Sequence, residues 1–303
     1  MQGRPERDRW RLPEGLKFAP ASASVLFVQW PGGGLRIALG IEYDGAPFCG
    51  WQTQPTRPTV QDLVESAVAR IAGAPLRVVC AGRTDTGVHA LGQVVHFDSD
   101  ASRPRSAWVK GVNAHLSPSV SVIWARPVAP EFHARFSALG RRYEYVLLNR
   151  PVRPAVGAAG VGWFPLPLEI DAMRAAAVHL LGTHDFSSFR SAQCQAKSPV
   201  RELRDVSIER DGDIIRFRLE ANAFLHHMVR NIIGCLVYVG KGKHSPDWIG
   251  QLLRSRDRAL AAPTFAPQGL YLTAVDYAAQ WGLPGSAARR PFSYSPSSPC
   301  EPG

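Results

Sequence analysis

A tight turn between two strand-like segments is the strongest single constraint on the fold. Asp211-Gly212 separates residues 206–210 from residues 214–220, and both segments are rich in β-forming residues. An Asp-Gly pair is typical of a two-residue hairpin, because glycine tolerates the positive φ that such a turn requires. The second half of the chain is therefore predicted to contain two adjacent antiparallel strands.

The remaining pattern alternates between strands and helices. Leu35–Tyr43 has the period-2 alternation of a half-buried strand. Thr59 is predicted to cap a helix, with Asp62 as its capping partner and an apolar stripe that runs to Ile71. Other strands are predicted at residues 76–81, 93–98, 141–148 and 270–277. Other helices are predicted after Asp171 as an N-cap, at about 226–239, and after Ser245 as an N-cap with Pro246 at the first helical position.

Together these elements predict an α+β protein in which helices cover one face of a mainly antiparallel sheet. The Pro-rich residues 150–167 are the expected linker, with an N-terminal α/β subdomain at 35–150 and a C-terminal one at 151–280. Residues 281–303 are expected to be a disordered tail. Residues 1–34 are expected to be a disordered extension, with an RNA-contacting basic arm or a start codon assigned too far upstream as alternatives.

The charge balance favours a polyanionic partner. The 303 residues carry a formal net charge of +10, and the sequence pI is about 9.8. Lysines and arginines that neutralise phosphates release counterions, which supplies much of the affinity for nucleic acid. A basic protein without such a partner has the same composition, so the charge alone leaves both possibilities open.

The cysteines and apolar segments bear on the compartment. The five cysteines are scattered and include no C-x-x-C pair, so neither a disulfide framework nor a structural zinc site is expected. No apolar run approaches the length of a membrane span, and residues 25–30 are too few for the core of a signal peptide. We therefore expect a cytoplasmic protein that does not associate with membranes.

Residues 82–90 (GRTDTGVHA) carry the clearest chemical signal. Their two glycines permit a tight excursion of the backbone directly after a predicted strand. Such a loop would present Arg83, Asp85 and His89 from a rigid support, as a nucleophilic carboxylate requires. A structural turn in which Asp85 bonds its own backbone is the alternative.

The triplet Asp85-Thr86-Gly87 also occurs in aspartic proteases. Those enzymes need two carboxylates that share one proton. The chain contains a single Asp-Thr-Gly triplet, so a protease would have to assemble its pair of carboxylates across a dimer.

Arginines alternate with aromatic residues in residues 132–143 (FHARFSALGRRY), here called the basic segment. Guanidinium groups contact phosphates and aromatic rings stack on bases, so this composition suits RNA binding. In the strand expected to follow, Tyr143 and Tyr145 share one face. The alternative is two core tyrosines beside a solvated run of charge.

Residues 222–231 (NAFLHHMVRN), here called the histidine segment, place two adjacent histidines near the expected start of a helix. Consecutive helical residues point in different directions, so His226 and His227 are expected to be a poor pair of metal ligands. Arg230 could be buried if it meets an acid, and Asp85 is a natural partner. The alternative is a surface arginine.

At these three segments the sequence closely resembles the tRNA pseudouridine synthase A family. The matching stretches are residues 82–90, 132–143 and 222–234, and they occur in order over about residues 35–280. Several long motifs in order are more specific than any single one. The shorter supporting matches are Tyr43-Asp44-Gly45, Gly50-Trp51-Gln52, Gly111-Val112-Asn113, residues 185–189 and residues 269–272.

The resemblance implies an isomerase that converts uridine to pseudouridine at positions 38–40 of the tRNA anticodon stem-loop. It implies a flipped target base, attack by Asp85, and neither a metal nor a cofactor. It also implies the pseudouridine synthase fold, in which two α/β subdomains share a continuous sheet, and a homodimer that binds tRNA.

Site residues follow from the resemblance position by position. Asp85 matches the catalytic aspartate, Arg83 the arginine that helps displace the base, Tyr143 the active-site tyrosine, and Arg230 the arginine paired with the aspartate. The tRNA contacts expected beyond these are Arg103, Phe132, His133, Ala134, Arg135, Phe136, Cys194, Gln195, Ala196, Lys197 and Ser198.

The sequence departs from the family pattern at two places. Thr86 stands where alanine is usual, and Leu139-Gly140 replaces a more typical Thr-Ala pair. Neither place carries an assigned role. A catalytically silent RNA-binding protein and a dimeric aspartic protease remain the alternative functions.

Overall fold

The computed structural model describes residues 34–285 and residue 291. The expectations for residues 1–33, 286–290 and 292–303 lie outside the described residues. Within the described part, the chain forms the predicted α+β fold.

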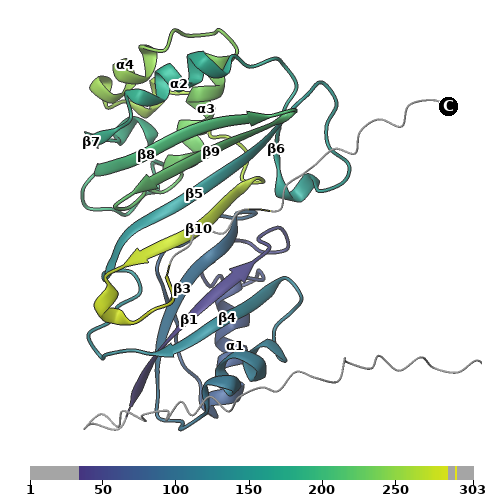
Figure 1. Ribbon diagram of the computed structural model, residues 1–303, viewed down its shortest axis with the longest axis vertical. Helices are drawn as coiled ribbons and strands as arrows, with labels where there is room; N and C mark the ends of the chain where they lie inside the picture. The colour runs from purple at the N-terminus through teal and green to yellow at the C-terminus, as the bar shows by residue number, and fades with distance from the viewer. Residues whose placement is uncertain (1–33, 286–290, 292–303) are drawn as a thin grey trace, which may run out of the picture. The chain divides into compact units, whose positions relative to one another are not determined.

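A single ten-stranded sheet runs through both halves of the described chain (Figure 1). Its main path has the order β4-β1-β3-β10-β5-β9-β8-β7, with β2 paired to β3 and β6 paired to β5. All strand pairs are antiparallel except β3–β10 and β5–β6. The strands are β1 (Leu35–Tyr43), β2 (Val79–Cys80), β3 (His89–Ser99), β4 (Val120–Pro127), β5 (Ala138–Asn149), β6 (Gly162–Phe164), β7 (Gly182–Asp185), β8 (Val200–Asp211), β9 (Ile214–Ala221) and β10 (Leu270–Tyr277).

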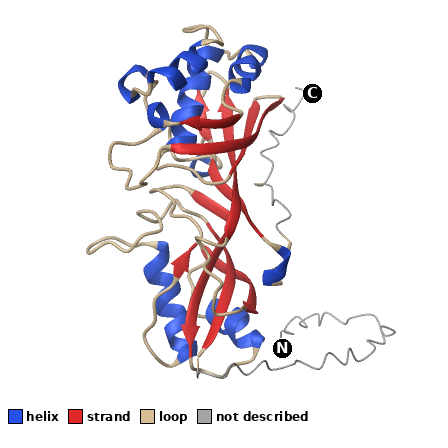
Figure 2. Ribbon diagram, turned by 90° about the vertical axis from the view of Figure 1, so that its left-hand side faces the viewer, coloured by secondary structure: helices blue, strands red, loops and turns tan. Residues whose placement is uncertain are grey.

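The α-helices of the described residues lie on one face of this sheet in both halves (Figure 2). They are α1 (Val60–Ala72), α2 (Ile170–Val178), α3 (Met228–Gly240) and α4 (Trp248–Ser255). Shorter helical turns are η1 (Ala107–Gly111), η2 (Ala158–Gly160), η3 (Ser187–Phe189), η4 (Arg258–Leu260) and η5 (Ala279–Trp281). Among the described residues no helix has both the length and the apolar composition needed to cross a bilayer.

Two large core clusters form under these helices. The N-terminal cluster joins α1 to β1, β3 and β4, and the C-terminal cluster joins α2, α3 and α4 to β5 and β9. Tyr143 of β5 packs against both clusters, whereas Val88, which directly precedes β3, belongs to the C-terminal one. The residues around position 85 therefore lie where the two cores meet.

The strands that join the halves cross the expected boundary at residue 150. Tyr145 and Leu147 precede the boundary but lie in the C-terminal cluster. Leu272 and Val275 of β10 follow it but lie in the N-terminal cluster. Strands from each half contribute to the core of the other half because β10 lies between β3 and β5. A domain boundary between residues 150 and 151 stays a prediction.

Local sequence signals predicted the positions of several helices and turns to within a residue or two. Thr59 is the N-cap of α1, and its hydroxyl accepts the N–H of Asp62 at 3.3 Å. The predicted hairpin joins β8 to β9, although Asp211 pairs with Ile214, so the connecting residues are Gly212 (φ 55°) and Asp213. The turn is one residue further along than predicted.

Two predicted helix caps were wrong. The N-cap of α2 is Glu169, and Asp171 lies in the first turn, where it pairs with Arg174 at 2.9 Å. The N-cap of α4 is Asp247 rather than Ser245. In both regions a residue with capping chemistry stands near the helix start, and the packing of the helix against the sheet decides where the first turn forms.

Replacing Thr59 by alanine is expected to reduce the free energy of unfolding by about 1 kcal/mol, because the Asp62 N–H loses its acceptor. Equilibrium unfolding in urea measures the change. Asp171→Ala is the matched control, because Asp171 lies in the first helical turn without serving as the cap and its side chain is 94% exposed. An equal loss in both variants would contradict a capping role for Thr59.

Candidate active site at Asp85

The loop that carries Asp85 connects β2 to β3 and is held by buried groups of the N-terminal half. The N–H of Trp51 donates to the Thr84 carbonyl at 3.0 Å. The hydroxyls of Tyr43 and Thr84 are hydrogen-bonded at 2.7 Å, and the Gln93 side-chain amide donates to the Gly82 carbonyl at 2.6 Å. The loop is therefore a rigid support, as its glycines and preceding strand led us to expect.

A close approach at Gly50 is part of this support. Gly50 has φ 84°, and a Cβ there would lie 2.7 Å from the Thr84 carbonyl oxygen and 3.1 Å from the Asp85 carbonyl carbon. Both contacts are with backbone, which cannot move away without displacing the loop. The Gly50-Trp51 pair noted in the sequence thus has a steric reason.

The loop contains a backbone turn at Asp85, which differs from the side-chain turn considered as the alternative. The N–H of Val88 donates to the Asp85 carbonyl at 3.1 Å, and Gly87 takes the positive φ of 76°. The turn is closed by backbone groups, and the carboxylate meets side chains of the histidine segment instead. The structural turn and a chemical role for Asp85 are therefore compatible.

Three cationic or hydrogen-bonding groups converge on the Asp85 carboxylate. Arg230 Nη1 donates to Oδ2 at 3.0 Å, so the ion pair suggested by the sequence is present. His226 Nε2 lies 3.3 Å from Oδ1, and His227 Nε2 lies 3.3 Å from Oδ2. The Asp85 side chain is 21% exposed, so a molecule from solvent can still reach it.

The two histidines converge because the helix begins after them. α3 starts at Met228, and His227 is its N-cap with a left-handed backbone, φ 62°. The rings of His226 and His227 lie 4.0 Å apart between centroids. The expectation that these side chains diverge was wrong, because helical spacing does not apply before the first turn. A left-handed non-glycine residue costs about 1–2 kcal/mol, and such strain clusters at functional sites.

The segment that follows η4 fixes the orientation of the Arg230 side chain. Its Nε donates to the Phe265 carbonyl at 2.8 Å, and the Phe265 N–H donates back to the Arg230 carbonyl at 3.2 Å. The Arg230 side chain is 13% exposed. This anchoring aims the guanidinium at Asp85, and no motif in the sequence marked Phe265 for the role.

Tyr143 forms an apolar wall beside the carboxylate. Its ring packs edge-on against Phe224, with centroids 5.1 Å apart and planes at 84°. A Cβ at Gly82 would lie 4.0 Å from the phenol oxygen, so the Asp85 loop passes close to the ring. Burial, and secondarily the Asp85 carboxylate, raise the pKa of Tyr143, so its phenol keeps its proton at neutral pH.

The charge state of His227 follows from its surroundings. Burial lowers the pKa of His227, Asp85 opposes this shift, and His226, Arg230 and Arg258 add to it. The imidazole is therefore neutral near pH 7 and has a free nitrogen lone pair to offer.

Arg141 of β5 joins the basic segment and the histidine segment to the residue that precedes the Asp85 loop. Its guanidinium donates to the carbonyls of Ala81 at 3.1 Å, Arg135 at 2.6 Å and Asn222 at 3.0 Å. The residue is 9% exposed, and burial lowers its pKa. Sequence reasoning read Arg141 only as one of several arginines, because a set of backbone partners leaves no trace in sequence.

The basic segment divides into buried and exposed residues. Phe132 and Ala134 are fully buried in the N-terminal core, so their side chains anchor the segment. Phe136 is 76% exposed, His133 stacks on it at 4.3 Å between centroids, and the Arg135 guanidinium lies 5.6 Å from its ring. Of the five residues expected to touch tRNA here, His133, Arg135 and Phe136 form the accessible group.

A buried histidine holds this segment in place. His96 of β3 accepts the Ala134 N–H at its Nδ1 at 3.1 Å, and its ring lies 4.9 Å from that of His133. Burial lowers the pKa of His96 to about 4, with the nearby Arg36 and His133 adding to the shift. His96 is 4% exposed and stays neutral at physiological pH.

Residues 194–198 reach the site through Cys194. Its sulfur accepts the His226 N–H at 3.5 Å, and Arg190 donates to the carbonyls of Cys194 at 2.6 Å and Ala196 at 3.0 Å. Gln195, Lys197 and Ser198 are exposed, so they are available to a ligand that covers the site.

Arg83 and Arg103 differ in their distance from Asp85. Arg83 is exposed on the same loop, two residues from the carboxylate. Arg103 donates to the Ile71 carbonyl at 3.0 Å, in the last turn of α1. Because α1 starts beside Gly50 and rises about 1.5 Å per residue, Arg103 contacts this helix roughly 16 Å along its axis from the end near the Asp85 loop. It can contact only a large ligand that extends along this helix.

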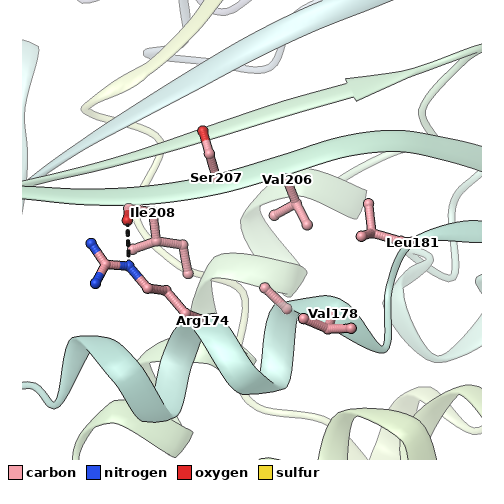
Figure 3. A pocket seen from close by; sticks show the side chains of 7 residues that line it. Arg174, Val178, Leu181, Val206, Ser207 and Ile208 are labelled. Carbon is pink, nitrogen blue, oxygen red and sulfur yellow. Dashed lines mark hydrogen bonds between the residues drawn. The ribbon is translucent and has the colours of Figure 1, made fainter.

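A separate surface cavity of about 290 Å³ lies between α2 and β8 (Figure 3). Its lining residues are Arg174, Ala177, Val178, Leu181, Val206, Ser207 and Ile208. The Arg174 Nε is committed to the Ile208 carbonyl at 2.9 Å. The lining includes no carboxylate, imidazole or thiol, so this cavity lacks the groups for the chemistry expected at Asp85.

Known proteins resemble this chain in sequence, including the segments that carry its motifs. The profile of a family described as tRNA pseudouridine synthase matches residues 40–137 and 176–278. A protein named tRNA pseudouridine synthase A from Dechloromonas aromatica (strain RCB) is 58% identical over 250 residues, which is 82% of this chain and 95% of the relative. A protein of the same name from Methylobacillus flagellatus is 58% identical over 252 residues, covering 83% of this chain and 97% of its own.

Among solved structures, the archaeal box H/ACA sRNP Nop10-Cbf5 complex overlaps 78% of this chain and 47% of its own chain. The identity is 16% and the TM-score 0.33. The sequence relatives are far more similar, and the matched ranges include the Asp85 loop and the histidine segment.

Acidification is expected to destabilise the fold through His96. The folded-state pKa of about 4 lies below the ordinary value of 6.5, so between these values the unfolded chain binds a proton that the native protein refuses. Stability is fully present above pH 6.5 and falls by up to about 3 kcal/mol as the pH approaches 4. Urea unfolding from pH 7 to pH 4 measures this. His96→Asn, which keeps an acceptor without titrating, should flatten the profile, and an unchanged profile would contradict the assignment.

Proposed function

This chain belongs to the tRNA pseudouridine synthase family, and we propose that it isomerises uridine to pseudouridine in the anticodon stem-loop of tRNA, with Asp85 as the nucleophile. The observation that carries the proposal is the Asp85 carboxylate, 3.0 Å from the Arg230 guanidinium at the junction of two cores, with Tyr143 beside it. The target positions are 38–40, as the family resemblance implies.

The reaction requires the target base to leave the helical stack. Extruding a nucleotide costs a few kcal/mol, which contacts with the rest of the RNA must offset. Proteins recognise double-stranded RNA mainly through shape and phosphates, because the A-form major groove is too narrow to be read. The basic chain, with a net charge of +10, and the exposed Arg83 and Arg135 suit this mode of binding.

At the site, the N1–C1′ bond of uridine breaks and a C5–C1′ bond forms. The proton lost from C5 is balanced by the proton gained at N1, so the reaction consumes neither water nor an oxidant. Asp85 attacks the nucleoside, at the base or at the sugar, and leaves again when the uracil has turned and reattached. Arg230 holds the carboxylate in position throughout.

Tyr143 and Phe224 supply the apolar surface that the detached uracil needs. The Tyr143 phenol keeps its proton because burial and Asp85 raise its pKa. A dry wall of this kind prevents water from capturing the glycosyl intermediate while the base turns.

The exposed part of the basic segment supports binding around the flipped nucleotide. The ring of Phe136, backed by His133, offers a face on which an unpaired base can stack. Arg135 adds a guanidinium for a neighbouring phosphate. We include Arg103 and residues 194–198 among the tRNA contacts, since a tRNA is large enough to reach both.

Neither alternative function accounts for this geometry as well. An aspartic protease needs a second carboxylate against the first, whereas the groups that meet the Asp85 carboxylate within the described residues 34–285 are Arg230, His226 and His227. A silent RNA-binding protein has no need of a partly buried ion pair beside a phenol.

We further propose that the enzyme acts as a homodimer in the cytoplasm. The dimer follows from the family resemblance. A reducing compartment suits Cys49, Cys80, Cys194 and Cys235, which are all free thiols.

Asp85→Asn is expected to abolish pseudouridine formation while leaving tRNA affinity within a few-fold of the parent value. The amide keeps the size and a hydrogen-bond acceptor for Arg230 but is not nucleophilic. Carbodiimide mapping of an unmodified tRNA transcript measures the product and its position. Asp205→Asn, an exposed change on β8, is the control. Turnover retained in the Asp85 variant would refute the assignment.

Arg135→Ala is expected to weaken tRNA binding and to reduce the slope of log Kd against log salt by about 1, because one phosphate contact is lost. Filter binding over a range of salt concentrations measures the slope. Arg254→Ala, an exposed arginine on α4, is the matched control and should leave the slope unchanged. An unaltered slope for Arg135→Ala would mean that this guanidinium does not contact phosphate.

A further inference from the structure

We propose that Asp85, His226 and His227 form a Zn²⁺ site in the RNA-free enzyme, and that the ion and the target nucleotide exclude each other. Metal binding stands apart from the proposed function. The mutual exclusion rests on the proposed function, since it requires that the nucleotide reacts at Asp85.

The spacing of the three ligand atoms suits a tetrahedral ion. One carboxylate oxygen and both imidazole nitrogens lie within 4.8 Å of one another. Zn²⁺ binds nitrogen and oxygen at about 2.0–2.2 Å, so neighbouring ligands at tetrahedral angles are about 3.3–3.5 Å apart. His226 Nε2 lies 3.3 Å from Oδ1 of Asp85, and His227 Nε2 lies 3.3 Å from Oδ2 of the same carboxylate, so small side-chain shifts suffice to bring both nitrogens around an ion on Oδ1.

The backbone presents the two histidines together. The left-handed conformation of His227 turns consecutive side chains toward one carboxylate, which a continuous helix would not do. The peptide of His226 is held by the bond from its N–H to the Cys194 sulfur. The ligand geometry is thus present before an ion arrives, which lowers the cost of binding.

The site is open on one side. The side chains of His226, His227 and Asp85 are 35%, 27% and 21% exposed. Three protein ligands with access to solvent leave a fourth position for water, which is the arrangement of exchangeable rather than structural zinc sites.

The surroundings both support and limit the binding of a cation. Arg230 donates to Oδ2 of Asp85, so Oδ1 can bind the ion while a second-shell hydrogen bond orients the carboxylate. The positive charge of the guanidinium opposes the ion. We therefore expect reversible binding, weaker than at a structural site.

Zn²⁺ bound at this site would inhibit the enzyme. A metal-bound carboxylate is a weaker nucleophile, because the ion withdraws its electron density, and the ion with its water fills the space that the everted uridine enters. Zn²⁺ should act as a competitive inhibitor that a chelator removes.

The test is an equilibrium titration of the full chain with Zn²⁺ by calorimetry, and with Co²⁺ as a probe whose visible spectrum reports tetrahedral coordination. One ion per chain is expected. His226→Gln and His227→Asn each remove one imidazole, and asparagine tolerates the left-handed backbone at position 227. Both variants should bind Zn²⁺ at least tenfold more weakly. His115→Ala, an exposed histidine, is the control and should bind like the parent.

Inhibition is measured separately, as the dependence of pseudouridine formation on Zn²⁺ at several tRNA concentrations. If Zn²⁺ inhibits competitively with tRNA, and if both histidine variants are less sensitive to Zn²⁺, the mutual exclusion of ion and nucleotide is supported. Absence of a one-to-one complex, or equal binding by all variants, overturns the site. Zn²⁺ binding that depends on both histidines but does not compete with tRNA overturns only the exclusion. Turnover retained by Asp85→Asn defeats the proposed function and leaves the metal site standing. Urea unfolding of each variant verifies that it folds.

Discussion

The ion pair between Asp85 and Arg230 is the interaction on which the site depends. It joins residues 145 positions apart, one on a loop of the N-terminal half and one on the first turn of α3. The side chains are 21% and 13% exposed, so the pair lies partly out of water. Removing either partner would leave the other charge poorly compensated, which is the costly outcome for a buried pair. The two halves must therefore keep their relative position for the carboxylate to be held.

The sheet maintains that position. β10, the last strand of the described residues, lies between β3 and β5, so it joins the strand that follows the Asp85 loop to the strand that carries Tyr143. Arg141 adds a second connection, since one buried guanidinium donates to the strand before the loop, the basic segment and the histidine segment. Its partners are carbonyls, so this connection leaves the negative charge of Asp85 to Arg230 and the histidines.

The nucleophile proposed here must be both held and reachable, and the surroundings of Asp85 combine the two. Arg230 and Phe265 fix the carboxylate from one side, while the two histidines remain accessible from the other. The left-handed His227 is the strained element of the arrangement. A carboxylate and two imidazoles brought together with solvent access also suit a divalent cation, so the features that would expose the proposed nucleophile to RNA would also provide the proposed affinity for metal.

The sequence by itself determined the elements and signals that depend on neighbouring residues: Thr59 as the cap of α1, β1 and β10 at their observed bounds, the hairpin between β8 and β9 to within one residue of its turn, and the motifs that indicate the family. Their cause is local, in period, turn chemistry and capping. The tertiary structure alone decided that Phe132 is core while Phe136 is exposed, that Phe265 aims Arg230, and that His226 and His227 meet at one carboxylate. Some of these contacts join residues that are tens to more than a hundred positions apart, and others depend on the residue at which a helix starts. Packing across the whole sheet determines both the long-range contacts and the helix start.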